Sequence, residues 1–181
     1  PEMASGVIEV KGIVREPGSR AKIAVKSNDE HVDPVGALVG QRGVRVAVVT
    51  SELGGEKIDV VEWAENHGEY VKESLKPAQV LGIELFEDEG RAVVQVAEDQ
   101  QSLAIGRGGQ NVRLAARLTG WKIDIRSTQG AQIAGTEAGG VAIRGAEMAE
   151  EKMSDVAEKK GEMEDEMNAA SPAKEGETPK E

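Results

Sequence analysis

Apolar and polar residues alternate along several short segments of the chain, which is the pattern of strands with one buried face. Residues 7–15 (VIEVKGIVR) and 20–27 (RAKIAVKS) show it on either side of residues 16–19 (EPGS), where Pro followed by Gly favours a type II turn. Residues 81–86 (LGIELF) and 91–98 (RAVVQVAE) show it again around the sequence EDEG. The pattern therefore predicts two β-hairpins.

A longer segment occurs twice. GQRGVRVAVVTSELGGEKIDV, which starts at Gly40, aligns with GRGGQNVRLAARLTGWKIDI, which starts at Gly106, with one single-residue gap. The β-branched residues of 44–50 favour a strand on propensity alone, whereas the matching QNVRLAARL is a strong helix former. Because two copies of one unit share a fold, we predict a helix over 44–53, and a strand after each copy of this helix. The identical pairs are Gly40/Gly106, Gly43/Gly109, Val46/Val112, Leu53/Leu118, Gly55/Gly120, Lys57/Lys122, Ile58/Ile123 and Asp59/Asp124.

Residues 67–77 (HGEYVKESLKP) predict a short helix that ends at Pro77. The second copy then follows the order helix, strand, strand, helix, GxxG, helix, strand. The first copy follows the same order, except that its leading helix is cut short at Pro1. We therefore expect an α+β protein with a first domain over residues 1–64 and a second over 65–128.

The C-terminal region differs in composition. The whole chain carries a net charge of -11. From residue 131 on, 13 Asp/Glu stand against 6 Lys/Arg, so this region contributes -7 of that charge, and it contains neither Leu nor an aromatic residue. Such a segment buries too little apolar area to offset the entropy of ordering. We predict that residues 129–181 form a disordered acidic tail. A transient amphipathic helix is the alternative, because apolar residues recur there at three- and four-residue spacings, apart from Lys160 in the same register: Ala149, Met153, Val156, Met163 and Met167.

A GxxG turn between two helices suits contact with a nucleic-acid backbone. Glycines at both ends let the main chain approach phosphate, and the amides that open the next helix present donors to it. Positive charge gathers around the second turn, although Arg113 and Arg117 also fit an ordinary solvated helix face. The candidate RNA-binding residues are Gly40, Gln41, Arg42, Gly43, Arg45, Lys57, Gly106, Arg107, Gly108, Gly109, Gln110, Asn111, Arg113, Arg117 and Lys122.

These segments resemble the tandem KH region of the NusA family of bacterial transcription factors. The resemblance covers about residues 7–127, and it is most specific from SLAIGRGGQN to GWKIDI. It implies two type II KH domains that bind nascent single-stranded RNA at RNA polymerase and influence pausing, termination and antitermination. Complete members also carry an N-terminal polymerase-binding domain and an S1 domain, and neither fits ahead of Pro1. We therefore expect a fragment that docks on polymerase mainly through domains outside this sequence.

Other classes are less well supported. The two histidines, His31 and His67, lack metal-ligand spacing, cysteine is absent, and no phosphate-binding GxxxxGK[ST] loop occurs. We expect no catalytic residue, no metal and no cofactor, hence no enzyme. No apolar run is long enough to span a bilayer. A cytoplasmic monomer without a membrane partner is the simplest expectation.

A protein-binding adaptor remains the alternative function. The acidic tail could recruit a basic partner, or it could mask the basic KH surface in the absence of RNA. A pure adaptor would have no affinity for RNA.

Overall fold

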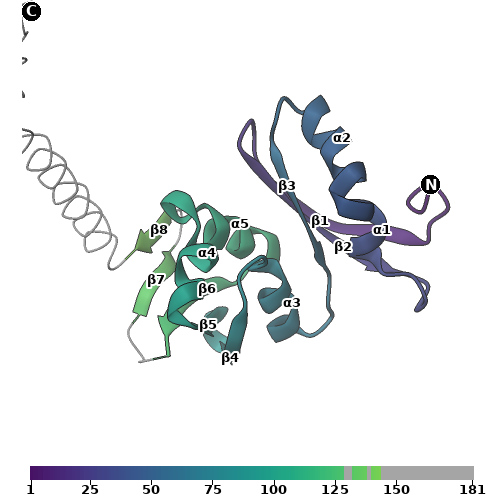
Figure 1. Ribbon diagram of the computed structural model, residues 1–181. Helices are drawn as coiled ribbons and strands as arrows, with labels where there is room; N and C mark the ends of the chain where they lie inside the picture. Colours follow the sequence, from purple (N-terminus) through teal and green to yellow (C-terminus); the bar gives the residue numbers. More distant parts are fainter. Residues whose placement is uncertain (129–131, 138–139, 144–181) are drawn as a thin grey trace, which may run out of the picture. The chain divides into compact units, whose positions relative to one another are not determined.

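The computed structural model describes residues 1–128, 132–137 and 140–143 of the chain. Two domains of the same design follow each other in these residues, each built on a sheet with helices along one face (Figure 1). No helix among them is long and apolar enough to cross a membrane.

The first domain starts with an antiparallel hairpin of β1 (Ile8–Glu16) and β2 (Arg20–Ser27). Gly18 has a φ of 74°, and Ser19 N donates to Glu16 O over 3.0 Å, as the predicted type II turn requires. The chain continues through α1 (Pro34–Val39), the 3-10 turn η1 (Gln41–Gly43), α2 (Val44–Glu52) and β3 (Lys57–Glu62). Strand β3 pairs parallel with β2, so the sheet order is β1-β2-β3.

The second domain repeats this order and adds a leading helix. It contains α3 (His67–Ser74), β4 (Val80–Phe86), η2 (Glu87–Glu89), β5 (Arg91–Val96), η3 (Glu98–Gln100), α4 (Gln101–Ile105), η4 (Arg107–Gly109), α5 (Gln110–Thr119) and β6 (Lys122–Ser127). Strands β4 and β5 are antiparallel, and β5 and β6 are parallel. The predicted α+β class and the order helix-strand-strand-helix-GxxG-helix-strand are confirmed.

The expectation of a disordered tail from residue 129 is wrong for two segments. β7 (Gln132–Glu137) pairs antiparallel with β6, and β8 (Gly140–Ile143) pairs with β7, so the second sheet has five strands. The open edge of β6 stabilises the added strand through backbone hydrogen bonds, which need no large side chain. Ala134 and Thr136 are buried there, and the Thr136 hydroxyl accepts from Ile123 N over 2.6 Å. Composition averaged over fifty residues hid this short strand.

The remaining part of the expected tail lies outside the described residues. It comprises residues 129–131, 138–139 and 144–181, and it includes the apolar register from Ala149 to Met167.

Helix α2 forms over the β-branched segment, as the repeat predicted, but it has no buried side chain. Val48 and Val49 are 56% and 45% exposed, whereas their counterparts in α5, Leu114 and Ala115, are 0% exposed. In the second domain, α3 packs against α5, β4 and β5. The described residues ahead of β1 form no helix that could cover α2 in the same way.

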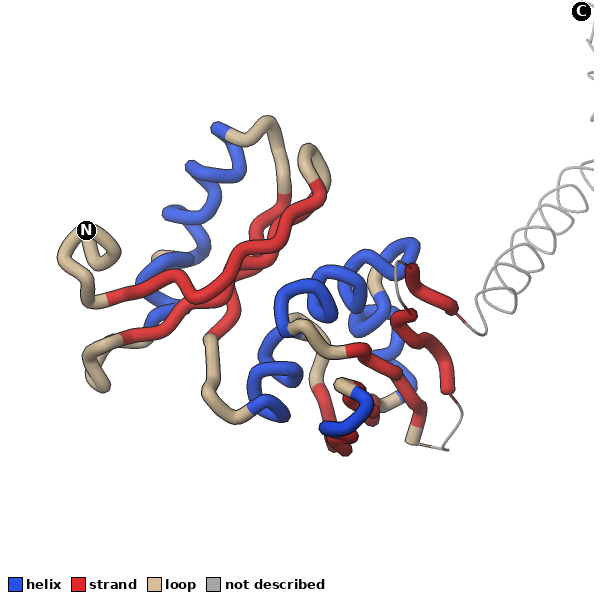
Figure 2. The backbone as a smooth tube through the Cα atoms, turned by 180° about the vertical axis from the view of Figure 1, so that it is seen from behind, coloured by secondary structure: helices blue, strands red, loops and turns tan. Residues whose placement is uncertain are grey.

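The second domain packs on the sheet face of the first domain that α1 and α2 leave open. α5 contacts β1 and β2, and α3 contacts β3; Figure 2 shows the sheet between the two sets of helices. Leu118 lies over Gly12, where an added Cβ would come within 3.2 Å of Leu118 Cδ1. The buried Lys22 Nζ of the first domain donates to Lys76 O of the second over 2.9 Å. The contacts of Leu118 with Gly12 and of Lys22 with Lys76 hold the two domains together, and within the second domain Tyr70 Oη donates to Leu118 O over 3.3 Å.

Candidate nucleic-acid interface

The first glycine of each GxxG tetrapeptide has nearly the same backbone conformation. Gly40 has φ 74° and ψ 170°, and Gly106 has φ 74° and ψ 168°. A Cβ on Gly106 would lie 2.8 Å from the backbone nitrogen of Asn111, which cannot move away as a flexible side chain can. Only glycine therefore fits at this corner, where α4 ends and the loop begins.

The third and fourth positions of both loops are left-handed. The third is Arg42 in the first loop (φ 54°) and Gly108 in the second (φ 57°), and the fourth is Gly43 (φ 79°) or Gly109 (φ 72°). Arg42 is the one residue other than glycine with a positive φ in the described part of the chain. The two loops thus share one shape, although the first has a side chain where the second has none.

A helix begins immediately after each loop. Both α2 and α5 have a glycine at the N-cap and no side chain bonded to the amides of the first turn. These amides and the positive end of the helix dipole lie next to the glycine corner. Each loop therefore combines a glycine-rich main chain, in which Gly108 is exposed and Gly109 is buried, with a site that favours an anion.

Three side chains of the loops are free to contact a ligand. Gln41, Arg42 and Arg107 are exposed. Neither Arg42 nor Arg107 forms a hydrogen bond or ion pair with another described residue. Their positive charges therefore remain uncompensated at close range, one in each loop.

Asn111 has a structural position. Its side chain is 1% exposed, and Nδ2 donates to the carbonyl oxygens of Leu75, Leu103 and Ala104 over 2.9, 3.0 and 3.1 Å. Asn111 thereby provides hydrogen-bond donors for the free carbonyl groups at the end of α4, and it joins α4 to the segment after α3. The side chain is not accessible to RNA, so we do not retain Asn111 among the candidate contacts.

Arg45 is exposed but already paired. Its guanidinium donates to Ala37 O and to both carboxylate oxygens of Glu2, with Nη2 3.0 Å from Glu2 Oε2. The hydrogen bond from Arg45 lowers the pKa of Glu2 to about 2. Arg45 also covers Gly40, because its Cγ lies 2.7 Å from the place of an added Cβ. Its present role is to brace the first loop.

Gln110 and Arg113 face the first domain. Arg113 Nε donates to Glu16 Oε1 over 2.7 Å, and Gln110 Nε2 donates to Glu16 Oε2 over 2.7 Å and to Ser19 Oγ over 2.8 Å. The hydrogen bond from Arg113 is the main cause that holds the pKa of Glu16 below its usual range, against the effect of desolvation. Sequence reasoning missed Glu16, because nothing local connects two residues 97 positions apart.

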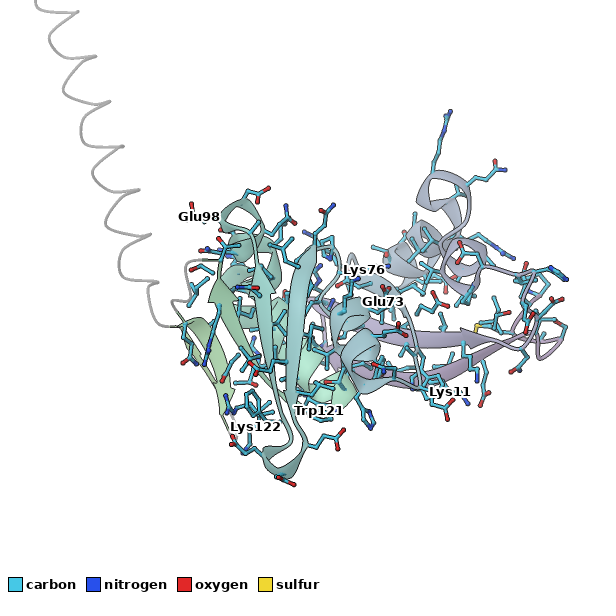
Figure 3. The ribbon with its side chains drawn as sticks, turned by 90° about the horizontal axis from the view of Figure 1, so that it is seen from below. Lys11, Glu73, Lys76, Glu98, Trp121 and Lys122 are labelled. Atoms are coloured by element: carbon cyan, nitrogen blue, oxygen red, sulfur yellow. The ribbon has the colours of Figure 1, made fainter. Side chains whose placement is uncertain are left out.

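The predicted lysines lie away from the loops. Lys57 and Lys122 open β3 and β6, after the C-terminal ends of α2 and α5, and the ten residues of α5 extend for about 15 Å. Figure 3 shows Lys122 and Glu98, which precedes α4, at opposite ends of the second sheet. Arg117 is exposed in the last turn of α5. The structure therefore does not bring these three side chains together with the glycine turns.

Metal-binding groups of three or more His, Cys, Asp or Glu residues do not occur in the described ranges. The chemistry that the loops support is the binding of a phosphodiester backbone by main-chain donors and two arginines.

Comparisons with known proteins agree with this geometry. Residues 1–63 match the model of the NusA-like first KH domain, and residues 67–133 match the model of the NusA-like second KH domain. The second match extends into β7, beyond the boundary expected at residue 128.

Three curated relatives carry the name transcription termination/antitermination protein NusA. The relative from Thermus thermophilus is 49% identical over 129 residues, which are 71% of this chain and 33% of the relative. Those from Halalkalibacterium halodurans and Bacillus subtilis are 50% and 49% identical over 135 residues, which are 75% of this chain and 35% and 36% of the relatives. The chain thus spans about a third of the length of these proteins.

Proposed function

Because the chain belongs to the family of NusA-like tandem KH domains, we propose that it binds single-stranded RNA through both GxxG loops, as part of a bacterial transcription termination/antitermination factor. The observation that carries the proposal is the pair of glycine turns with one backbone shape, each with an unpaired arginine and an uncapped helix start. The unpaired charges lie where KH loops hold about four backbone nucleotides.

The proposed contacts are fewer than the candidates from the sequence. Gln41, Arg42, Arg107 and the main chain of 40–43 and 106–108 are the direct contacts, whereas Gly109 is buried. Arg45 and Asn111 brace the loops. Arg117, in the last turn of α5, and Lys57 and Lys122, at the starts of β3 and β6, lie too far from the glycine turns to share one nucleotide with a loop. None of the four aromatic side chains belongs to a loop, and those of Trp63, Tyr70, Trp121 and Phe86 contact other side chains. RNA is therefore held by backbone and polar contacts more than by stacking.

The whole factor supplies the context of this activity. We infer that the bound strand is nascent RNA at RNA polymerase in the cytoplasm, and that binding influences pausing, termination and antitermination. Contacts with polymerase are expected mainly from parts of such factors outside this sequence.

The test replaces Arg42 and Arg107 by Asp, singly and together. Arg42→Asp and Arg107→Asp each exchange an attractive charge for a repulsive one next to phosphate, and both positions are exposed, so the fold should be unaffected. We expect each single variant to weaken binding of a single-stranded RNA of about ten nucleotides, long enough for both loops, and the double variant to lose most of it. Fluorescence anisotropy at fixed salt measures the affinity.

The control is Lys72→Asp, which makes the same change of charge on α3, outside both loops. It should weaken binding much less than either loop variant. Equal losses in all three variants would mean that RNA responds only to net charge, and an unaffected double variant would overturn the proposed function. Double-stranded RNA of the same sequence should bind more weakly than the single strand.

A further inference from the structure

Arg113 connects the second GxxG loop to the first domain. Its Nη1 donates to Gly108 O in the loop over 3.1 Å, while its Nε donates to Glu16 Oε1 at the end of β1 over 2.7 Å. Gln110, one turn earlier on α5, donates to the second oxygen of the same carboxylate. We name these hydrogen bonds of Glu16 with Gln110 and Arg113 the Glu16 contact.

We propose that Arg113 is a positioning residue, which together with Glu16 fastens the second GxxG loop to the first domain in its RNA-binding shape. This inference rests on the proposed function of the loops. RNA binding by the second loop then depends on the packing of the two domains, and Arg113 itself does not contact phosphate.

The charge of Arg113 is already compensated. Both oxygens of Glu16 accept charge-assisted or short hydrogen bonds, and the side chains of Arg113 and Glu16 are only 35% and 23% exposed. Arg107, in contrast, is exposed and has no partner among the described residues. Contact with Arg107 therefore contributes more to the free energy of phosphate binding than contact with Arg113, which would first have to break its hydrogen bond with a carboxylate.

The Glu16 contact fixes one end of α5, and a second set of contacts fixes the other. At the C-terminal end, the Leu118 side chain lies over Gly12 of the first domain, while its carbonyl accepts from Tyr70 Oη of α3 in the second domain. Because both ends of α5 contact the first domain, α5 cannot tilt without breaking one set. Gly108 O, which Arg113 holds, is thereby placed relative to the first domain.

Among the residues that the structure describes, none attaches the first loop to the other domain in this way. Aligned on their first glycines, Gln110 and Arg113 of α5 correspond to Val44 and Ala47 of α2, whose side chains cannot bind a carboxylate. The dependence on domain packing is thus a property of the second loop alone.

The variants Glu16→Gln, Arg113→Gln and their combination separate positioning from direct contact. If Arg113 is a phosphate contact that Glu16 restrains, Glu16→Gln frees its charge, adds one to the net charge and tightens RNA binding. If Arg113 is a positioning residue, Glu16→Gln weakens binding in spite of the added positive charge. The two readings therefore predict changes of opposite sign.

The experiment measures RNA affinity of the whole chain at several potassium chloride concentrations. We expect each single variant to bind about tenfold more weakly, and the double variant no more weakly than the singles, because both remove one contact. The salt dependence should stay as in the unmodified chain, whereas loss of one phosphate contact lowers its slope by about 0.7. Tighter binding by Glu16→Gln, or a lowered slope for Arg113→Gln, would overturn the proposal.

Two further measurements keep the outcome unambiguous. Glu89→Gln is the matched control, because it also removes a carboxylate bonded to an arginine, Arg91, within one domain; it should not weaken binding. Hydrogen exchange of the Gly108 and Gly109 amides without RNA should accelerate in Glu16→Gln, and unchanged exchange would also reject the Glu16 contact as a brace. If the double variant of Arg42→Asp and Arg107→Asp binds RNA normally, the proposed function fails; if Arg107→Asp loses binding and Glu16→Gln does not, only the positioning role fails.

Discussion

Replacing Asp59 by Asn should destabilise the protein far more than the same change at Asp124, the matching position of the second domain. Asp59 accepts two hydrogen bonds from Arg20, over 2.8 and 3.0 Å, and one from Lys22 Nζ over 3.0 Å. Lys22 is 0% exposed, and burial lowers its pKa in spite of the neighbouring carboxylate. In the second sheet, Val93 occupies the register of Lys22. The Asn variant therefore leaves a buried ammonium without its carboxylate in the first domain only.

Two limits bound the cost. At 3.0 Å and an effective dielectric constant of about 20, the attraction between Lys22 and Asp59 is about 5.5 kcal/mol. If Lys22 instead becomes neutral, the cost is the free energy of removing its proton at pH 7. With a reference pKa of about 10.4 for lysine, this free energy is about 4.6 kcal/mol. Removing one partner of a buried pair usually costs about 3–5 kcal/mol. Because Asp59 is 19% exposed and water reaches it, we expect a loss of about 3–4 kcal/mol.

For Asp124→Asn we expect about 0–1 kcal/mol, the range of partly exposed ion pairs, since Arg91 keeps Glu89 at 2.7 Å and loses only a contact of 3.3 Å. Urea denaturation at pH 7, with equal m-values, measures both losses. If Asp59→Asn comes within about 1 kcal/mol of Asp124→Asn, Lys22 does not depend on its carboxylate and the reasoning fails.

Two other predictions concern packing and pH. Leu114→Ala should lower the free energy of unfolding by about 2–5 kcal/mol, whereas Val48→Ala at the matching exposed position should change it by about 0.5 kcal/mol or less; equal losses in thermal melts would contradict the exposed face of α2. The lowered pKa of Glu16 means that its contribution to stability is complete above the unfolded value of about 4.3 and is lost as pH falls through the folded value. Stability should therefore decrease in that acid range, less steeply in Glu16→Gln, as urea midpoints between neutral and acid pH will show; identical pH profiles would exclude this role.

Much of the fold follows from the sequence because hairpins, helix ends and glycine turns depend on neighbouring residues. Residues 16–19 predict their turn by the order of Pro and Gly, and the turn has the required positive φ at Gly18. The repeat corrected the strand propensity of 44–50, since a helix in one copy implies a helix in the other. It could not reveal that α2 is exposed while α5 is buried, because that difference depends on α3.

The strands after residue 131 show a second limit. β7 is stabilised by the edge of β6, and the availability of an edge is a property of the sheet and not of residues 132–137. A segment with too few apolar residues to form a core by itself can still add a strand to a sheet that other residues have formed.

The sequence by itself determined that this protein contains two copies of one unit and that each copy has a glycine turn before a helix. Tertiary structure alone decided which polar side chains near these turns remain free. Arg42 and Arg107 face solvent, whereas Arg113 and Gln110 pair with Glu16, and Asn111 is buried. The physical reason is range: a turn is defined within four residues, but the partner of a charge is whichever group the packing of distant segments places within hydrogen-bond distance.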